Sequence, residues 1–321
     1  MAVPRKALTV GIDVGGTSLR AAVVDGTGQV RELLRVPTPK SADALDDSLD
    51  QAVRTLAARH SIAAVGLAVA GFVSDDRSTV RFAPHLPWLD APVGVELSAR
   101  LGLPVILEHD ANAALVGEHR FGAAAGGRVV ALIAIGTGIG AALLIDGTLY
   151  RGAHGIAPEL GHLQVVPDGR ACPCGKRGCW ERYCSGTALA RTAGQLLAAE
   201  PGGSRTLAHA AADPDSLTGR LVAAAARDGD PIAVAAMRDL AGWLGLGLAG
   251  VADMYDPDLV VIGGGVSASA PLFLDDARER YAAALTGAGH RPLARIRAAQ
   301  LGDAAGMIGA AELARAAHTD G

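Results

Sequence analysis

The sequence predicts an α/β protein built from two domains of related plan. Its 321 residues, half of them hydrophobic, exceed what one average domain needs. Apolar runs of strand length alternate with segments of helical periodicity along the chain. A strand, a glycine turn and a second strand also occur twice, at Ile12–Thr27 and at Ile133–Thr148. Length, alternation and repeat together predict two α/β domains.

The repeat aligns IDVGGTSLRAAVVDGT with IAIGTGIGAALLIDGT, and the second copy begins 121 residues after the first. Gly15 coincides with Gly136, Ala21 coincides with Ala142, and both copies close on Asp-Gly-Thr. In each copy a glycine turn separates two apolar runs, as in a hairpin of buried strands. A hairpin repeated at this spacing suggests two domains of common ancestry.

The remaining elements follow from the pattern of apolar residues. Residues 41–60 carry Leu45, Leu49, Val53 and Leu56 at helical spacing, which predicts an amphipathic helix. The other strands are expected at 63–70, 104–107, 259–262 and 295–301. The other helices are expected at 111–119, at 231–253, in most of the chain from 187 onward, and in a closing helix from about 304.

Composition and charge exclude several classes of partner. The formal net charge of −4 gives no basic surface for nucleic acid, and the chain starts without the apolar segment of a secretory signal. The apolar run Val129–Ile145 approaches membrane-spanning length, but Gly136-Thr137-Gly138 at its middle predicts a turn between two strands. We therefore expect a cytoplasmic protein without a nucleic-acid or membrane partner, in which thiols stay reduced.

The glycine turns are candidate phosphate-binding sites. Glycines let backbone N–H groups approach a polyphosphate, and Asp13 at the end of a strand is placed to hold Mg²⁺ or its water. The alternative is a tight hairpin that needs positive φ and binds nothing. A dinucleotide fingerprint does not fit GTGIGA, because an apolar strand rather than a helix follows it. Three clusters favour a nucleotide: Gly15-Gly16-Thr17, Gly136-Thr137-Gly138 and Gly263-Gly264-Gly265.

Asp110 lies where a predicted strand ends and a predicted helix begins, in EHDANAALVGE. An aspartate in this place is a favoured helix N-cap, so a purely structural role is one interpretation. In a phosphotransferase, a carboxylate at a strand tip is also well placed to accept the proton of an attacking hydroxyl. The residue alone does not decide between the two.

Three cysteines lie within eight positions and follow a histidine, as His162, Cys172, Cys174 and Cys179. Three thiolates and one imidazole form a common closed zinc site, whereas a disulfide is disfavoured in a reducing compartment and no C-x-x-C motif is present. Cys184 lies outside this spacing and is interpreted as a buried thiol. We expect structural zinc in this segment.

Two glutamates border the cysteine segment. Glu159 precedes His162 by three residues, and Glu181 follows Cys179 by two. Carboxylates on a loop that a metal holds rigid are suited to hydrogen-bonding several hydroxyls of a polyol. Solvated surface carboxylates are the alternative for each of them.

These motifs resemble the ROK family of repressors, open reading frames and sugar kinases. GIDVGGTSLR, AVAGFV, HDANAALVGE, IAIGTGIGA, ELGH and CPCGKRGCWE occur in the family's order, and GGGVS and AQLGDAAGMIGAA extend the resemblance over nearly the whole chain. Within the family they are most similar to bacterial ATP-dependent glucokinases of actinomycete type. The resemblance implies an actin-like ATPase fold of two ribonuclease-H-like domains with an interdomain cleft, and phosphorylation of glucose at its 6-hydroxyl.

The resemblance also implies roles for individual residues. Asp110 matches the catalytic base, and Mg²⁺ accompanies ATP. The first two glycine turns match the phosphate-binding loops, and Gly263-Gly264-Gly265 matches the adenosine side. His162, Cys172, Cys174 and Cys179 match the zinc ligands. The positions that match sugar contacts are Gly71, Asp110, Glu159, His162 and Glu181.

One residue departs from the family pattern. The residue before the catalytic aspartate is usually asparagine in the sugar kinases and helps to hold the sugar, and here it is His109. Histidine still donates a hydrogen bond but is larger and titrates near neutral pH. Mannose, fructose or N-acetylmannosamine therefore stay open as sugars, and polyphosphate stays open as a less favoured donor.

The resemblance extends to domain limits, assembly and one non-enzymatic alternative. We expect a small N-terminal α/β domain at 1–119, on which a closing helix at 303–318 packs, and a larger domain at 120–302 that carries a zinc-binding loop at 159–184. A homo-oligomer, dimer or tetramer, is expected. A sugar-responsive repressor is disfavoured, because the first phosphate-loop strand begins near Leu8 and leaves no room before it for a DNA-binding domain.

Overall fold

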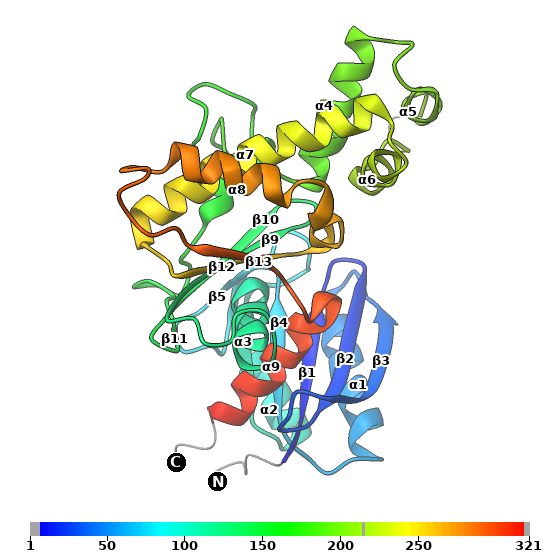
Figure 1. Ribbon diagram of the computed structural model, residues 1–321. Coiled ribbons are helices and arrows are strands. Elements are labelled where there is room, and N and C mark those ends of the chain that lie inside the picture. The colour runs from blue at the N-terminus through cyan, green and yellow to red at the C-terminus, as the bar shows by residue number, and fades with distance from the viewer. Residues whose placement is uncertain (1–6, 214–215, 318–321) are drawn as a thin grey trace. The chain divides into compact units, whose positions relative to one another are not determined.

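A computed structural model describes residues 7–213 and 216–317 (Figure 1). Its contacts divide the chain into two compact units: the first comprises 1–127, 142–158 and 303–321, and the second comprises 128–141 and 159–302. The expected domain limits stay a prediction. Residues 1–6 of the expected first domain and residue 318 of the expected closing helix lie outside the described residues.

The two main sheets have the same topology. Their strand orders are β3-β2-β1-β4-β8 and β11-β10-β9-β12-β13. In the first sheet, β1 pairs antiparallel with β2 and parallel with β4, and in the second sheet β9 pairs parallel with β12, which pairs parallel with β13. The strands of the first sheet are β1 (Leu8–Val14), β2 (Ser18–Val24), β3 (Val30–Pro37), β4 (Ile62–Val69) and β8 (Val105–His109). Those of the second are β9 (Val129–Ile135), β10 (Ile139–Ile145), β11 (Thr148–Leu149), β12 (Leu259–Gly263) and β13 (Arg295–Ala298).

The repeated hairpin of the sequence occupies the same place in both sheets. β1 and β2 enclose the first glycine turn, and β9 and β10 enclose the second. The apolar run considered as a membrane span therefore forms two strands, as predicted. A small third sheet contains β5 (Phe72–Val73), β6 (Val80–Phe82) and β7 (Leu89–Ala91).

Most helices lie where they were expected, apart from a few residues at their ends, but the helix at Val93–Leu101 was not predicted from the sequence. In the first unit they are α1 (Ala42–Ala57), α2 (Val93–Leu101), α3 (Asp110–Phe121) and α9 (Ala305–Ala316). In the second unit they are α4 (Gly186–Ala199), α5 (Arg205–Ala211), α6 (Gly219–Arg227), α7 (Pro231–Tyr255) and α8 (Leu274–Ala284). Short 3₁₀ helices are η1 (Leu160–His162), η2 (Trp180–Arg182), η3 (Gly265–Leu272) and η4 (Gly302–Ala304). β13 ends at Ala298, three residues earlier than expected.

The two faces of the first sheet carry side chains of different size. On β4, Val65, Leu67 and Val69 belong to a large core that also holds the apolar stripe of α1. The alternate residues Ala64 and Ala68 pack with α9 and its neighbours instead. Because successive side chains of a strand point to opposite faces, one face accommodates bulky packing and the other a close helix.

Glycines allow α9 to lie directly on the first sheet and on α3, as Figure 1 shows. A Cβ on Gly11 would overlap the backbone oxygen of Met307, and one on Gly66 would overlap that of Ala310. A Cβ on Gly309 of the helix would overlap the backbone oxygen of Ala113 in α3. These backbones approach so closely that no side chain fits between them.

α7 is the long apolar helix of the second unit. By length and composition it is the helix among the described residues that reaches membrane-spanning dimensions, with a mean hydropathy of 1.4 over an 18-residue window. Of that window, 61% is buried inside the protein, and α7 packs against α4, α6 and α8. This burial and this packing identify α7 as a core helix of the second unit. Pro231 at its first turn and the Asp230 side chain, which accepts the Ala233 N–H at 3.0 Å, set its start.

We expect Gly66→Ala to destabilise the first unit by about 3 kcal/mol or more, because the new methyl group meets a backbone atom that cannot rotate away. Gly250→Ala is the matched control: this α7 glycine has open space at its Cβ position, so the change should stabilise the helix by up to about 1 kcal/mol. Thermal unfolding followed by circular dichroism measures both. Equal midpoints for the two variants would contradict the close packing of α9.

Candidate functional site

The first glycine turn connects β1 and β2, and its carbonyl groups are held by the protein. Gly15 O accepts the Thr38 hydroxyl at 2.6 Å, and Thr17 O accepts the Thr38 N–H at 3.2 Å. Lys40 Nζ lies 3.4 Å from Gly16 O. Because donors occupy these oxygens, the turn's remaining N–H groups are the polar groups left for an anion.

The second glycine turn is held in the same manner. Gly136 O accepts the Gly186 N–H at 2.8 Å, and Thr137 O accepts the Thr187 hydroxyl at 2.8 Å. Both donors lie in the first residues of α4, and Gly136 N–H closes the hairpin on Gly138 O at 2.9 Å. The two turns therefore share both their position in the sheet and the way their carbonyl groups are occupied.

Positive φ is not the reason for glycine in these two turns. Among the described residues with positive φ, Gly15, Gly16, Gly136 and Gly138 are absent. The alternative of a hairpin that needs left-handed glycines is therefore wrong. Close approach of neighbouring atoms explains glycine better, since a Cβ on Gly16 would lie 3.1 Å from the Cβ of His85.

The third cluster, Gly263-Gly264-Gly265, follows β12. Gly264 has a φ of 75°, and a Cβ there would lie 2.5 Å from the backbone oxygen of Ile135 at the end of β9. This glycine is required by both conformation and close approach. Gly265 has open space at its Cβ position.

Asp13 is the second-last residue of β1, close to the first turn, and pairs with Arg20 on β2. Burial raises the pKa of the Asp13 carboxyl, although Arg20 acts in the opposite direction. The sequence interpretation assigned Asp13 to Mg²⁺ or its water and overlooked Arg20. The pairing occupies Oδ2 of Asp13, so Oδ1 is the oxygen available for such a role.

Asp110 is the first residue of α3, and His109 occupies the N-cap position. Asp110 Oδ1 accepts the N–H of its neighbour Ala111 at 2.7 Å and lies 3.3 Å from Nε2 of His109. A capping carboxylate accepts N–H groups two or three residues further on, so Asp110 is not the cap of this helix. Its side chain is 41% exposed. The positive end of the helix favours a negative charge at this place.

A buried carboxylate next to Asp110 was missed in the sequence. Glu108 is 3% exposed, and its Oε2 accepts Nε and Nη2 of Arg151 at 2.9 and 2.5 Å. Its Oε1 accepts the His109 N–H at 3.1 Å and the Asn112 side-chain amide at 2.9 Å. The contacts with His109 and Asn112 fix the chain on both sides of Asp110.

Gly71 follows β4, and its neighbours explain why it is glycine. A Cβ there would lie 2.5 Å from Phe82 O and 2.8 Å from the Cβ of Ala83. Its N–H donates to Val69 O at 2.9 Å. Close packing on the small third sheet therefore accounts for this residue, and its match to a sugar contact stays a prediction.

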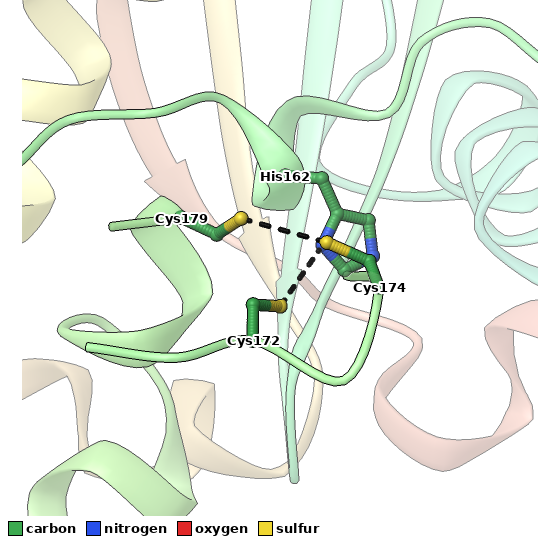
Figure 2. Close-up of side chains that lie close together, drawn as sticks. All are labelled: His162, Cys172, Cys174 and Cys179. Atoms are coloured by element: carbon green, nitrogen blue, oxygen red, sulfur yellow. Dashed lines mark hydrogen bonds between the residues drawn. The ribbon is translucent and has the colours of Figure 1, made fainter. Parts of the chain in front are cut away.

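The histidine and the three cysteines of the cysteine segment come together in the second unit, as Figure 2 shows. His162, Cys172, Cys174 and Cys179 each offer one ligand atom, and these atoms all lie within 4.8 Å of one another. Nδ1 of His162 lies 3.7 Å from Cys172 Sγ, and Cys174 Sγ lies 3.6 Å from Cys179 Sγ. Three sulfurs and one nitrogen at this spacing suit a tetrahedral Zn²⁺.

The thiols differ in their surroundings. Burial raises the pKa of Cys172, and burial together with hydrogen bonding to Cys174 raises the pKa of Cys179 to about 12. A metal that binds here must therefore displace the protons of these two thiols. Cys184 is fully buried outside the cluster, and its burial raises its pKa.

Aromatic contacts anchor the cysteine segment to α7. Trp180 is fully buried, and its Nε1 donates to Trp243 O at 2.8 Å. A Cβ on Gly247 would overlap the Trp180 ring. The centroid of the Tyr183 ring lies 4.6 Å from that of the Trp243 ring, and Cζ of Arg170 lies over the Tyr183 ring at 4.6 Å. These contacts hold the C-terminal end of the cysteine segment against α7, and they do not require a metal.

The two glutamates of the segment have different environments. Glu159 Oε2 lies 4.0 Å from Nε2 of His162, the ring nitrogen that is turned away from Cys172. Glu181 Oε2 accepts the Ile139 N–H at 2.9 Å, directly after the second glycine turn. The candidate residues thus come from both units: Asp110 from the first, and Glu159, His162 and Glu181 from the second.

Residues 9–317 match the ROK family, which is nearly the whole chain. The chain belongs to the ROK family. Its fold is accordingly the α/β, actin-like ATPase fold that the motifs implied.

Several known proteins are similar to this chain over most of their length. A glucokinase of Streptomyces coelicolor is 46% identical over 309 residues, which are 96% of this chain and 98% of the relative. The crystal structure of a ROK family glucokinase from Streptomyces griseus in complex with glucose and AMPPNP is 45% identical, with a TM-score of 0.87 over 97% of this chain and 100% of that one. A xylose repressor of Bacillus subtilis is 28% identical over 84% of this chain and 67% of the relative.

We expect Cys174→Ser to lower the metal content of the purified protein, because it removes one of four converging ligand atoms. Cys184→Ala is the matched control, since this thiol lies outside the cluster and should leave the metal content unchanged. Elemental analysis by mass spectrometry gives the metal-to-protein ratio. Equal ratios in Cys174→Ser and the wild type would contradict a metal site at these residues.

Proposed function

We propose that this protein is an ATP-dependent kinase that phosphorylates glucose at its 6-hydroxyl. The observation that carries the proposal is the half-exposed carboxylate of Asp110 at the tip of β8, flanked by residues that the buried Glu108 holds. The similarity to a glucokinase whose structure contains glucose and AMPPNP supports the choice of sugar and donor. The enzyme is expected to act in the cytoplasm, without nucleic acid or membrane.

In this mechanism Asp110 is the general base. Its free oxygen accepts the proton of the 6-hydroxyl as that oxygen attacks the γ-phosphorus of ATP, and the bond to the β–γ bridging oxygen breaks. The contact of Oδ1 with the Ala111 N–H holds the carboxylate in one orientation. The buried ion pair of Glu108 with Arg151 keeps the strand tip in place during the reaction.

The glycine turns are assigned to the nucleotide. The N–H groups of Gly15-Gly16-Thr17 and Gly136-Thr137-Gly138 are proposed to bind phosphate oxygens, and Gly263-Gly264-Gly265 to lie on the adenosine side. Occupied carbonyl groups in the first two turns support this assignment. Asp13 is proposed to contact the Mg²⁺ of the substrate Mg–ATP, or a water bound to it, through the oxygen that Arg20 leaves free.

The sugar is assigned to the residues that match sugar contacts in the family. Asp110 is proposed to receive the 6-hydroxyl, and Gly71 and His109 are proposed to contact the sugar as well. Glu159, Glu181 and Nε2 of His162 are proposed to bind other hydroxyls, since two carboxylates and a ring nitrogen offer the acceptors and donors that a polyol needs.

Zinc is proposed to have a structural role. The donor set of His162, Cys172, Cys174 and Cys179 fits Zn²⁺, and no fifth ligand is needed for a closed site. Zinc would hold His162 and the cysteine loop together and thereby order the two glutamates. All proton transfer in the proposed reaction belongs to Asp110.

Another hexose or an N-acetylhexosamine is the second candidate substrate. His109 favours keeping this candidate, because its Nε2 lies 3.3 Å from Asp110 Oδ1 and its ring is larger than the usual asparagine. Polyphosphate is the less favoured donor. A homo-oligomer, dimer or tetramer, remains part of the proposal.

Asp110→Asn should lower kcat by a factor on the order of 10²–10⁴, because asparagine cannot accept the hydroxyl proton. The glucose dissociation constant and the unfolding midpoint should stay close to the wild-type values, since the side chains have the same shape. Steady-state ADP release and calorimetric glucose titration measure these quantities. A kcat near that of the wild type would show that Asp110 is not the base.

His109→Asn should change the ranking of hexoses by kcat/KM, because the side chain next to the base becomes smaller and loses its contact with Asp110. Discrimination between sugars that differ in one hydroxyl is expected to move by about 1 kcal/mol, the effect of one hydrogen bond. Competition assays with pairs of hexoses measure the ratio directly. An unchanged ranking would mean that His109 does not select the sugar.

A further inference from the structure

Glu181 contacts the second glycine turn and not only the space assigned to the sugar. Its Oε2 accepts the Ile139 N–H at 2.9 Å. A Cβ on Gly138 would overlap the same carboxylate oxygen. Gly138 is therefore glycine because Glu181 lies against the backbone of the turn, which the spacing of glycines in the sequence does not reveal.

The chain that follows Glu181 holds the other residues of the turn. Gly186 N–H donates to Gly136 O, and the Thr187 hydroxyl donates to Thr137 O, both at 2.8 Å. Together with Glu181, these contacts reach Gly136, Thr137 and Ile139. One short stretch of chain, residues 181–187, thus fixes the turn from end to end.

Glu181 itself has little freedom to move. It lies in η2 between Cys179, a member of the candidate metal cluster, and the segment that begins α4. Its neighbour Trp180 is fully buried, donates its backbone N–H to Leu163 O at 2.8 Å and its ring N–H to Trp243 O. A side chain supported from both sides can hold the backbone of a glycine turn in one position.

The hydrogen bond also determines which N–H groups of the turn can meet a phosphate. The Ile139 N–H already donates to the Glu181 carboxylate and is therefore not available to a phosphate oxygen. Phosphate oxygens are therefore directed to the preceding peptide groups, at Thr137 and Gly138. Glu181 limits the anion site at one end and orients the peptides that remain in it.

We propose that Glu181 is a positioning residue for the turn Gly136–Ile139, through which the cysteine segment sets affinity for nucleotide as well as for sugar. This inference rests on the proposed function, because it takes the turn to bind phosphate. A residue that only contacted the sugar would not affect nucleotide binding in the absence of sugar. A positioning role for Glu181 predicts that its removal weakens nucleotide binding even when no sugar is present.

The test measures two quantities without any sugar. The first is the dissociation constant of a non-hydrolysable ATP analogue with Mg²⁺, by calorimetry, and the second is the exchange rate of the Ile139 amide, by NMR. Glu181→Ala should weaken nucleotide binding by about tenfold, the effect of losing one hydrogen bond that holds the turn, because the peptide groups that meet the phosphate lose their fixed orientation. The exchange of the Ile139 amide should become faster.

Three further variants separate the possible causes. Glu181→Gln keeps an acceptor oxygen at the same reach and should retain most of the nucleotide affinity and the protection of Ile139. Glu181→Asp keeps the charge but is one methylene shorter, so it should resemble Glu181→Ala. Glu159→Ala removes a carboxylate of the same segment and should weaken sugar binding only.

Unchanged nucleotide affinity and unchanged Ile139 exchange in Glu181→Ala, with sugar binding weakened, would overturn the inference and leave Glu181 as a sugar ligand. If the wild type binds no nucleotide at all, the proposed function fails. The exchange rates of Ile139 still report on Glu181 in that case, so the two failures are distinguishable.

Discussion

The convergence of His162, Cys172, Cys174 and Cys179 is the constraint on which the organisation of the second unit's site depends. Residues 159–184 contain only two short 3₁₀ helices and two isolated β-bridges, so little regular secondary structure orders them. Four ligand atoms within 4.8 Å of one another can do so. The cluster places Glu159 and Glu181 at its two edges, and Glu181 in turn contacts the second glycine turn. In the proposed function, a metal bound to this cluster would thereby influence the binding of both substrates.

Both units contain glycines whose lack of a side chain lets neighbouring groups approach the backbone closely. In the first unit, glycines at 11, 66 and 309 let α9 lie on the sheet and on α3. In the second unit, Gly138 admits a carboxylate and Gly247 admits the Trp180 ring. Glycine serves close approach at all these positions, whereas Gly264 also needs its left-handed conformation. The abundance of glycine in this chain thus reflects tight packing as well as turns.

Much of the fold could be predicted from the sequence because the signals are local. The repeated hairpin, the helix that begins at Pro231 and the spacing of the cysteines are all patterns of residues that are close in the sequence. The structure has these strands, this helix and the ligand cluster where they were expected. Glu108 could not be recognised, because its partner Arg151 is 43 residues away and only the folded chain brings them together. The same holds for Glu181 and Ile139, which are 42 residues apart. The role of Asp110 needed context, since only the structure shows that His109 and not Asp110 is the helix cap.

The central claim is that this ROK family member transfers a phosphoryl group from ATP to the 6-hydroxyl of glucose. The most direct measurement is ADP release by the purified protein across a panel of hexoses, with ATP and polyphosphate as alternative donors, followed by NMR of the phosphorylated product. We predict that glucose with ATP gives the highest kcat/KM and that the product is glucose 6-phosphate. Release of ADP that does not depend on any hexose, or a product phosphorylated at another position, would contradict the account.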